Sequence, residues 1–508
     1  MLFSDLVDTS CKVAVSSGRL AKIDLLADAL RRADPSEIET AIAFLSGTLR
    51  QAKLGVGHSL VQRVASEPPG ANATLTVADV DDALRRIESA AGKGSAKAKE
   101  TTLRELFARA SEPEQEFLFR LLTGEVRQGA LEGVMIEAVA RAAGIDASAV
   151  RRATMLASDL SIVGKAALTE GTAGLDRYTV HLFRPIQPML AQTADDVSQA
   201  LARLGRAALE IKLDGARIQA HKSGDHVRVF SRLLNEVTQA VPEVVDAVRR
   251  LPADTAILDG EAIALRADGS PLPFQTTMRR FGRKLDVDQL RAELPLRAFF
   301  FDILYARGQA LIDEPFQARS GVLAELVPEA ERPARLVTAD ASEAQAFYDR
   351  AIADGHEGVM AKALDAPYEA GSRGSAWLKV KAVHTLDLVV VAAEWGHGRR
   401  KGKLSNLHLG ARDPAGGFVM LGKTFKGLTD ELLEWQTGRL LELATEREGH
   451  IVWVRPELVV EIAFNGLQAS PRYPGGLALR FARVVRYRSD KTANEADTID
   501  AVRALYRP

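Results

Sequence analysis

The spacing of apolar residues changes twice along this chain, and these two changes limit its fold more than any other feature. Over residues 20–30 leucine, isoleucine and alanine recur at helical spacing, and this texture continues to about residue 180. Short, partly alternating apolar runs such as 208–213 and 256–264 follow, mixed with a helix candidate. From about residue 386 most runs are of the strand type. The sequence therefore predicts a multidomain chain with an all-α domain over 1–180, an α+β domain over 184–384 and an all-β domain over 386–508.

Length and turn residues support this division. A chain of 508 residues corresponds to about three domains of roughly 150 residues each. Pro185 and Pro188 resist both helix and central strand, which indicates a linker after the helical region. Several short strand candidates follow residue 386, and two of them flank the turn residues 413–417. This pattern is typical of a small β-barrel.

The charge balance and the cysteine content exclude several classes of protein. The chain has 66 basic and 67 acidic residues, a net charge of −1, so local basic surfaces must bind any polyanion. The single cysteine, Cys11, excludes an internal disulfide and a cysteine-rich zinc site. The longest apolar run, 388–393, is far shorter than the roughly 20 residues that span a bilayer, and the acidic N-terminus does not fit an export signal. We therefore expect a cytoplasmic protein with no membrane partner.

The helical region contains a short internal sequence repeat. Residues 45–51 (LSGTLRQ) resemble residues 122–128 (LTGEVRQ), with a hydroxyl residue, a glycine, an arginine and a glutamine in register. Exposed amides at helix ends, a hydroxyl group and an arginine suit a phosphate, so Arg50 and Arg127 are candidates for contact with a nucleic-acid backbone. The alternative is two ordinary helix joints with glycine C-caps.

A lysine motif near the middle of the chain is the first candidate for catalysis. Residues 210–217 read EIKLDGAR, with Lys212 at the end of a strand candidate. A lysine amine can attack phosphorus when it is unprotonated, a state that partial desolvation and neighbouring cations favour. The pattern Lys-x-Asp-Gly alone is a weak signal, because a surface strand ending in a turn also produces it. Its weight depends on partner residues elsewhere in the chain.

The partners that nucleotidyl transfer requires are present. Such chemistry needs carboxylates for Mg²⁺, cations for the phosphates and an apolar surface for the base. Glu261 ends a strand candidate, and Glu357 precedes a glycine. Lys379 and Lys381 lie on one face of a strand candidate, where two ammonium groups need an anion beside them. Phe301 follows an apolar run and can stack on a purine, although core packing is the alternative.

Taken in order, these segments resemble the six nucleotidyltransferase motifs shared by ATP-dependent DNA ligases and mRNA capping enzymes. The resemblance covers nearly the whole chain, and the helical front resembles the DNA-binding domain of archaeal and eukaryotic replicative ligases. The whole is similar to the three-domain ligases B of bacteria. One small departure is Ala482, where the family pattern has proline, and no functional group is lost. The segments that carry this resemblance are 212–215 (KLDG), 230–232 (FSR), 259–261 (DGE), 301–302 (FD), 357–358 (EG), 377–381 (WLKVK) and 480–491 (RFARVVRYRSDK).

The resemblance implies a role for each residue of the site. It implies that Lys212 becomes covalently attached to AMP, that Glu210 contacts the adenine edge and that Phe301 stacks on the adenine face. It implies that Glu261 binds the ribose and, together with Glu357, a Mg²⁺ ion. The implied contacts to the ribose and phosphates of ATP are Arg217, Arg232, Arg373, Lys379 and Lys381, and the residues implied to orient the pyrophosphate leaving group are Arg488, Asp490 and Lys491.

The implied activity is the ATP-dependent sealing of nicks in duplex DNA. Lys212 displaces pyrophosphate from ATP, AMP passes to the 5′-phosphate of the nick, and the 3′-hydroxyl then expels AMP to form the 3′–5′ phosphodiester bond. The barrel, an OB-fold in this family, must rotate about residues 382–387, because its tail serves ATP and its groove serves DNA. Removal of residues 1–180 is then expected to leave self-adenylylation largely intact and to cripple nick sealing.

Local basic clusters favour contact with a DNA backbone. Arg399, Arg400 and Lys401 lie between glycines, and arginines recur over 480–488; a solvated loop is the alternative for the first cluster. Binding that phosphates carry should depend on salt and little on base sequence. We expect nicked double-stranded DNA as the partner, a monomer that encircles it, and a nucleoid-associated location in replication, recombination or repair.

Two other functions share parts of this pattern. An mRNA capping guanylyltransferase has the lysine motif and the barrel but no place for a 180-residue helical front, and label transfer from GTP alone would indicate it. A non-catalytic DNA clamp would need neither Glu261 nor Glu357. An NAD-dependent ligase is disfavoured because one cysteine cannot supply the zinc module of that family.

Overall fold

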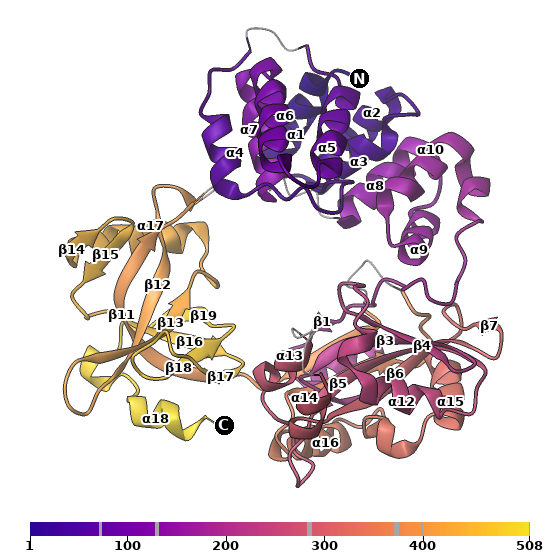
Figure 1. Cartoon of the computed structure of the whole chain (residues 1–508). Coiled ribbons are helices and arrows are strands. Elements are labelled where there is room, and N and C mark those ends of the chain that lie inside the picture. Colours follow the sequence, from indigo (N-terminus) through magenta and orange to yellow (C-terminus); the bar gives the residue numbers. More distant parts are fainter. Residues whose placement is uncertain (71–73, 127–131, 282–286, 370–374, 398–399, 507–508) are drawn as a thin grey trace.

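Three bodies follow one another in chain order and lie at the corners of a triangle (Figure 1). The first is helical, the second combines two sheets with helices, and the third is built on one large sheet. The helical, mixed and β-rich textures predicted from the sequence are therefore confirmed. In the part of the chain that is described, no helix is long and apolar enough to cross a membrane. The structure, a computed structural model, describes residues 1–70, 74–126, 132–281, 287–369, 375–397 and 400–506.

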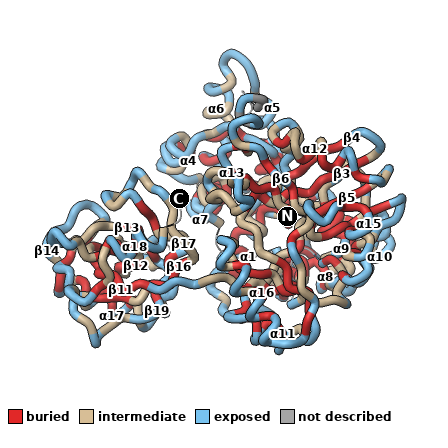
Figure 2. The backbone as a smooth tube through the Cα atoms, turned by 90° about the horizontal axis from the view of Figure 1, so that it is seen from below, coloured by how far each residue is buried: buried red, intermediate tan, exposed pale blue. Residues whose placement is uncertain are grey.

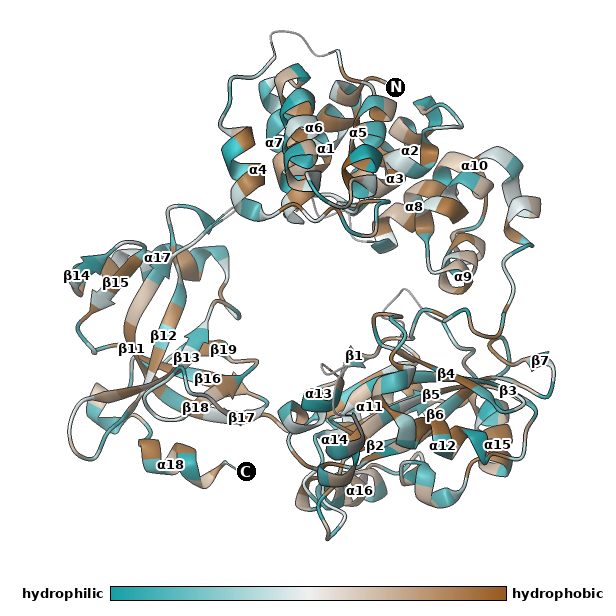
Figure 3. Cartoon of the chain, in the orientation of Figure 1, coloured by the Kyte–Doolittle hydropathy of each residue, from teal (hydrophilic) through white to brown (hydrophobic). Residues whose placement is uncertain are grey.

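The first body is a bundle of amphipathic helices, in which apolar and polar residues alternate along each ribbon (Figure 3). Phe3 is fully buried and packs edge-on against Phe44 and Phe117, with ring centroids 6.3 and 5.7 Å away. Thr76 and Asp79 form a capping box that fixes the start of the fifth helix. The helices are α1 (Phe3–Val15), α2 (Arg19–Arg32), α3 (Ile38–Leu45), α4 (His58–Ala65), α5 (Val77–Ser89), α6 (Ser95–Arg109), α7 (Glu112–Thr123), α8 (Glu132–Ala143), α9 (Ala147–Ala157) and α10 (Leu160–Leu175).

The second body follows a linker without helix or strand and contains the two sheets with their covering helices. Its first part comprises β1 (Gln192–Thr193), α11 (Val197–Leu204), β2 (Ala207–Lys212), β3 (Ala216–Ser223), β4 (His226–Ser231), η1 (Thr238–Ala240), α12 (Pro242–Arg249), β5 (Thr255–Ala264) and α13 (Phe274–Phe281). Its second part comprises α14 (Val287–Glu293), β6 (Leu296–Ala306), β7 (Gln309–Ala310), α15 (Phe316–Leu326), η2 (Glu329–Glu331), β8 (Arg335–Thr338), α16 (Ala341–Ala353), β9 (Gly358–Ala363) and β10 (Trp377–Lys381).

The register of these sheets brings distant motifs together. One sheet has the order β1-β10-β9-β2-β8 and the other β4-β3-β5-β6-β7, with buried residues along β3, β5 and β6 (Figure 2). Gly358 of β9 is the partner of both Lys212 on β2 and Lys381 on β10. Its φ is +146°, and a Cβ there would lie 2.1 Å from the Val380 carbonyl oxygen. Only glycine therefore lets the three strands meet beside Lys212.

The third body is a curved antiparallel sheet in which β11 pairs with β12, β15 and β16. From β12 the sheet continues to β13, from β15 to β14 and from β16 to β19, while β17 and β18 form a separate ribbon. A core of leucine, valine, isoleucine and phenylalanine fills the inside of the curve. The elements are β11 (His384–Trp395), β12 (Leu404–Arg412), β13 (Phe418–Thr424), α17 (Asp430–Glu442), β14 (Ala444–Glu448), β15 (Ile451–Val454), β16 (Val459–Phe464), β17 (Gly466–Ala469), β18 (Leu477–Arg480), β19 (Arg483–Tyr487), η4 (Ala493–Glu495) and α18 (Ile499–Ala504).

Ion pairs connect the bodies. Arg152 of α9 donates to both carboxylate oxygens of Asp313 in the second body, at 3.0 and 2.7 Å. Arg480 of β18 donates to Asp214, which follows β2, at 2.7 Å. The second contact places the third body beside the loop that carries the lysine motif.

Candidate active site

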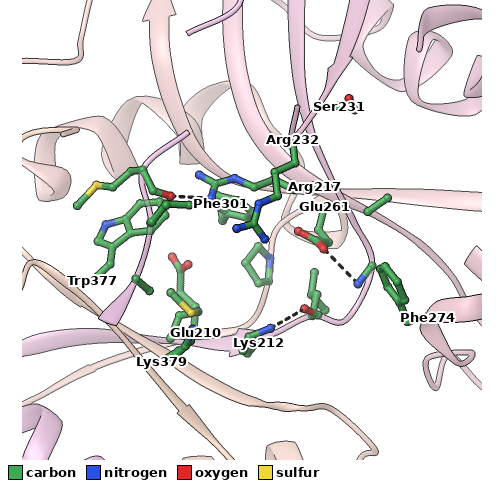
Figure 4. Close-up of a pocket in the computed structure, with 18 of the residues that line it drawn as sticks. Glu210, Lys212, Arg217, Ser231, Arg232, Glu261, Phe274, Phe301, Trp377 and Lys379 are labelled. Atoms are coloured by element: carbon green, nitrogen blue, oxygen red, sulfur yellow. Dashed lines mark hydrogen bonds between the residues drawn. The ribbon is translucent and has the colours of Figure 1, made fainter. Parts of the chain in front are cut away.

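A cavity of about 700 Å³ lies between the two sheets of the second body. Strands of one sheet supply Glu210, Lys212 and Lys379, and strands of the other sheet supply Arg217 and Glu261, so the two groups face one another (Figure 4). The cavity thus brings together residues from motifs that are up to about 170 positions apart in the sequence. The predicted residues that line it are Glu210, Lys212, Arg217, Arg232, Glu261, Phe301, Lys379 and Lys381.

Lys212 is held at the cavity by a carboxylate. Its ammonium group forms an ion pair with Glu357, whose other carboxylate oxygen is paired with Lys381. Lys212 also donates to the Leu213 carbonyl oxygen at 3.3 Å. Burial alone would raise the pKa of Glu357, but the two ammonium groups outweigh burial, so the pKa lies below its ordinary value. Glu357 is therefore an anion that lies between Lys212 of the KLDG segment and Lys381 of the WLKVK segment.

Glu261 carries the opposite shift. Burial raises the pKa of Glu261 from its ordinary value to about 7, although Lys212, Arg217 and the amide of Gly215 act against this rise. The Gly215 amide donates to its carboxylate at 3.1 Å. A carboxylate with a pKa near 7 can hold a proton or a metal ion according to conditions.

Two carboxylates at the cavity fit a Mg²⁺ ion. Mg²⁺ is usually bound by one or two protein carboxylates, with water and substrate phosphates completing its shell. Glu261 lines the cavity, and Glu357 contacts Lys212 at its edge. Within the described ranges no group of three or more His, Cys, Asp or Glu residues could hold a metal without a substrate. The donor set thus fits an ion that arrives with a nucleotide.

Arg217 is fixed by a buried hydrogen-bond network. It donates to both carboxylate oxygens of Asp259, at 3.0 and 2.7 Å, and to the Met189 carbonyl oxygen at 2.6 Å. The Tyr368 hydroxyl donates to Asp259 at 2.7 Å and accepts from the Met189 amide at 3.0 Å. The guanidinium group therefore reaches the cavity with its orientation already set. Nothing in the local sequence around Tyr368 predicted that its hydroxyl group belongs to this network.

Glu210 is fully paired inside the protein. Its carboxylate accepts from Arg335 and from Lys362, which lies 2.7 Å away. Lys362 is buried and lies over the rings of Trp377 and Phe301, at 4.4 and 4.7 Å from their centroids. Burial lowers the pKa of Lys362 from its ordinary value, although Glu210 acts to raise it. In the sequence, only the position of Lys362 at the end of the segment that begins with Glu357 indicated that this lysine belongs to the site.

Phe301 and Trp377 form the aromatic wall of the cavity. Their rings meet edge to face with centroids 6.0 Å apart, and both line the cavity. Such a wall can stack on a purine base. Arg232 also lines the cavity and is exposed (Figure 4). Arg373 lies outside the described residues.

The tail residues lie elsewhere in this structure. Arg488 and Lys491 both donate to one carboxylate oxygen of Asp387, at 2.8 and 2.6 Å. Arg488 also binds Asp490 through two hydrogen bonds. None of these three tail residues lines the cavity as the structure describes it.

The residues predicted to contact DNA have different surroundings. Arg50 is paired with Glu39 and Asp81, so its charge is used within the helical body. Gly47 has φ +72° and lies against Val126, so the two copies of the repeat touch, and the first copy contains the glycine turn that follows α3. In the third body Lys401 is exposed, and Arg400 donates to the Phe425 carbonyl oxygen. Arg127 and Arg399 lie outside the described residues.

These features define a class of protein. A lysine paired with a carboxylate, an aromatic wall and several cations around one cavity suit an enzyme that transfers a nucleotide through a lysine. The helical body before it and the β-rich body after it are available to hold a large substrate.

Comparison with known proteins identifies the family. Family models described as "DNA ligase N terminus", "ATP dependent DNA ligase domain" and "ATP dependent DNA ligase C terminal region" match residues 64–140, 188–381 and 400–491. The chain is 59% identical over 509 residues to a probable DNA ligase of Anaeromyxobacter sp. (strain Fw109-5), with 100% of this chain and 98% of the relative covered. It is 55% identical to a probable DNA ligase of Mycolicibacterium gilvum, with 100% and 99% covered.

The solved structure called "Pmar-Lig_Pre." shares the fold, with a TM-score of 0.64 and 19% identity over 95% of this chain and 99% of that chain. The chain belongs to the ATP-dependent DNA ligase family, whose members seal nicks in duplex DNA. This confirms the family, the enzyme class and the use of ATP that the sequence predicts. It decides against the capping enzyme and against the non-catalytic clamp.

Proposed function

We propose that Lys212 is the nucleophile of this ligase and that the cavity around it binds ATP. The observation that carries this proposal is the position of the Lys212 amine, which lies at the cavity in contact with Glu357. Phe301 and Trp377 supply a surface for adenine, and Lys379 and Lys381 supply positive charge for the phosphates. Arg217 and Arg232 are proposed to hold the ribose and α-phosphate, and Arg373 the phosphates.

The first step joins AMP to the protein. The Lys212 amine attacks the α-phosphorus of ATP, a P–N bond forms, and the P–O bond to pyrophosphate breaks. Glu357 contacts the ammonium group and so positions it, and the proton that Lys212 must lose passes to water. Glu210 is proposed to read the adenine edge, and its pairing with Lys362 and Arg335 fixes its position.

Glu261 and Glu357 are proposed to hold Mg²⁺ when ATP is present. When bound, the ion would neutralise charge on the phosphates and on the leaving group. Ionised Glu261 would bind the ribose and the ion on one side of the cavity, while Lys212 keeps its position on the other side of the cavity. Arg488, Asp490 and Lys491 are proposed to orient the pyrophosphate after the third body has turned.

The three bodies are proposed to be a DNA-binding domain over 1–180, an adenylation domain over 184–384 and an OB-fold domain over 386–508. AMP then passes to the 5′-phosphate of the nick, and the 3′-hydroxyl displaces it. The three bodies lie at the corners of a triangle, and we propose a monomer that surrounds nicked DNA with them (Figure 1). Arg400 and Lys401 are the proposed DNA contacts of the third body, while Arg50 supports its own domain. A place at the nucleoid, in replication, recombination or repair, belongs to the same proposal.

The test is covalent labelling of the full chain with ATP and MgCl₂, followed by peptide mass spectrometry. Wild-type protein should carry AMP on Lys212, and Lys212→Arg should carry none, because its guanidinium group cannot act as the nucleophile. Lys165→Arg, in the helical body, is the matched control and should label like wild type. An adduct on another lysine, or a nicked duplex that Lys212→Arg still seals, would overturn the assignment.

A further inference from the structure

Two residues of the helical body are buried in a core other than that of their own bundle. Met155 and Leu156, near the end of α9, are 3% and 2% exposed. The other helices share one core, whereas these two side chains belong to a separate apolar cluster. Most of that cluster comes from the linker and the adenylation domain: Ile186, Met189, Ile257, Leu304, Ile312, Tyr368 and Trp377.

The same cluster forms the back of the ATP cavity. Trp377 is a member of it, and Phe301 and Met360 pack against it. All three line the cavity, as does Met189. Trp377 is held edge-on between Phe301 and Tyr368, with both centroid distances 6.0 Å. The apolar wall proposed to receive adenine thus continues without a break to the side chains of α9.

The linker joins the same two places through its main chain. On its outer side the Gln187 amide donates to the Met155 carbonyl oxygen at 3.1 Å. On its inner side the Met189 carbonyl oxygen accepts from Arg217 at 2.6 Å, and its amide donates to Tyr368 at 3.0 Å. Only one residue separates the contact with α9 from the contact with the cavity arginine.

We propose that Met155 and Leu156 are positioning residues of the ATP site, acting through Trp377 and through the link from Met189 to Arg217. Protein interiors are close-packed, so a void behind the wall shifts the rings and the arginine that face the nucleotide. The helical domain then takes part in self-adenylylation before any DNA is bound. This rests on the proposed function of the cavity. It reverses the expectation from the sequence that residues 1–180 are dispensable for the first step.

The coupling must act in both directions. A ligand that orders the wall from the cavity side also stabilises α9, because two linked sites change one another's free energy equally. Loss of a contact that only holds two domains together would lower the free energy of unfolding and leave the affinity for ATP unchanged. The affinity for ATP therefore distinguishes positioning from simple packing.

The experiment compares two full-chain double variants in single-turnover self-adenylylation without DNA, over a range of ATP concentrations. Met155→Ala with Leu156→Ala should raise the KM for ATP about tenfold with less than threefold change in the maximum rate, as expected when a buried wall loses support. Met135→Ala with Leu121→Ala removes the same atoms from the main helical core, away from the cluster, and should change KM less than about twofold. Equal KM values for the first variant and wild type would overturn the proposal.

A volume-conserving swap supplies the rescue. Met155→Leu with Leu156→Met should restore the wild-type KM, because it refills the space with similar side chains. If the alanine pair does not fold, Leu156→Val takes its place, with about a threefold rise in KM expected from the smaller void. Hydrogen exchange gives a second readout: α,β-methylene-ATP should slow exchange over 183–191 in wild type and not in the variant with Met155→Ala and Leu156→Ala. Wild-type protein without AMP on Lys212 would instead contradict the proposed function itself.

Discussion

At the scale of single residues, environment gives two glutamates different tasks. Glu357 is held ionised by Lys212 and Lys381, while burial raises the pKa of Glu261 to about 7. The motifs that the sequence singles out bring Glu261, Lys212 and the two lysines of 377–381 to the lining of the cavity, and Glu357 contacts Lys212. It could not show that Glu210 pairs with Arg335, which lies 125 positions away, because that pairing depends on how β2 and β8 align.

The pKa of Glu261 leads to a prediction about pH. Between pH 6 and pH 8 the ionised fraction of Glu261 should rise from about one tenth to about nine tenths. If the ionised form holds the metal, single-turnover self-adenylylation at limiting MgCl₂ should rise up to about tenfold over this range. Glu261→Gln should be slow at every pH and should lack the rise. A pH profile of wild type that matches the glutamine variant would contradict the assignment.

The raised pKa of Glu261 should also make stability depend on pH, and stability should fall as pH rises, whereas activity should rise. Folded protein binds this proton more tightly than unfolded protein, whose glutamate titrates near its ordinary value, so stability falls as pH rises through about 7. At pH 8 Glu261→Gln should therefore unfold with a free energy about 1–3 kcal/mol higher than wild type. Urea unfolding at pH 5.5 and pH 8 measures this difference, and a difference that does not grow with pH would exclude a buried charge.

At the scale of elements, strand and helix types follow from periodicity, but their partners do not. The predicted runs 208–213 and 256–264 correspond to β2 (Ala207–Lys212) and β5 (Thr255–Ala264). Their periodicity shows which faces are apolar. It does not show that β9 lies between β2 and β10, an arrangement that depends on Gly358. The sequence repeat can be interpreted as a phosphate site or as two ordinary helix joints, and the ion pairs of Arg50 favour the second interpretation.

The start of β11 offers a prediction about the tail. Asp387 binds both Arg488 and Lys491, so it sets the shape of the segment that is proposed to orient pyrophosphate. Asp387→Ala should slow self-adenylylation about tenfold, as misplaced catalytic groups do. Sealing of a nick that already carries AMP should stay within about twofold, because pyrophosphate is absent from that step. Glu461→Ala, which frees the neighbouring Arg486, is the control. Equal slowing of both steps by Asp387→Ala would show a general defect instead.

At the scale of the whole molecule, the arrangement of the domains depends on contacts that local sequence patterns do not predict. The helical domain reaches the adenylation domain through α9, the linker and the Arg152–Asp313 pair. The third domain reaches it through Arg480 and Asp214, which are 266 positions apart. The linker contact includes Met189, and Asp214 lies two positions from Lys212; both Met189 and Lys212 line the cavity, so we expect the positions of the outer domains and the state of the cavity to be linked.

The Arg480–Asp214 pair leads to a prediction about the position of the third domain. Both side chains are partly buried, at 22% and 28% exposure, and the guanidinium group also lies over the Phe274 ring at the cavity. A contact of this kind is worth about 1 kcal/mol, which changes a two-state population about fivefold. Arg480→Ala should therefore populate other positions of the third domain. Raising the salt concentration should move wild type only slightly in the same direction, because burial limits screening.

The single cysteine makes this measurable by energy transfer between two dyes. Cys11 is exposed in the helical domain, and Ala415→Cys adds a second site in the exposed turn after β12. Single-molecule transfer efficiencies should form a narrow distribution in the parent protein and a broader or shifted one with Arg480→Ala. Arg472→Ala removes an equal charge from an exposed turn of the same domain and should leave the distribution unchanged. If Arg480→Ala and Arg472→Ala give the same distribution, the third domain is held by its linker and not by the ion pair at the lysine loop.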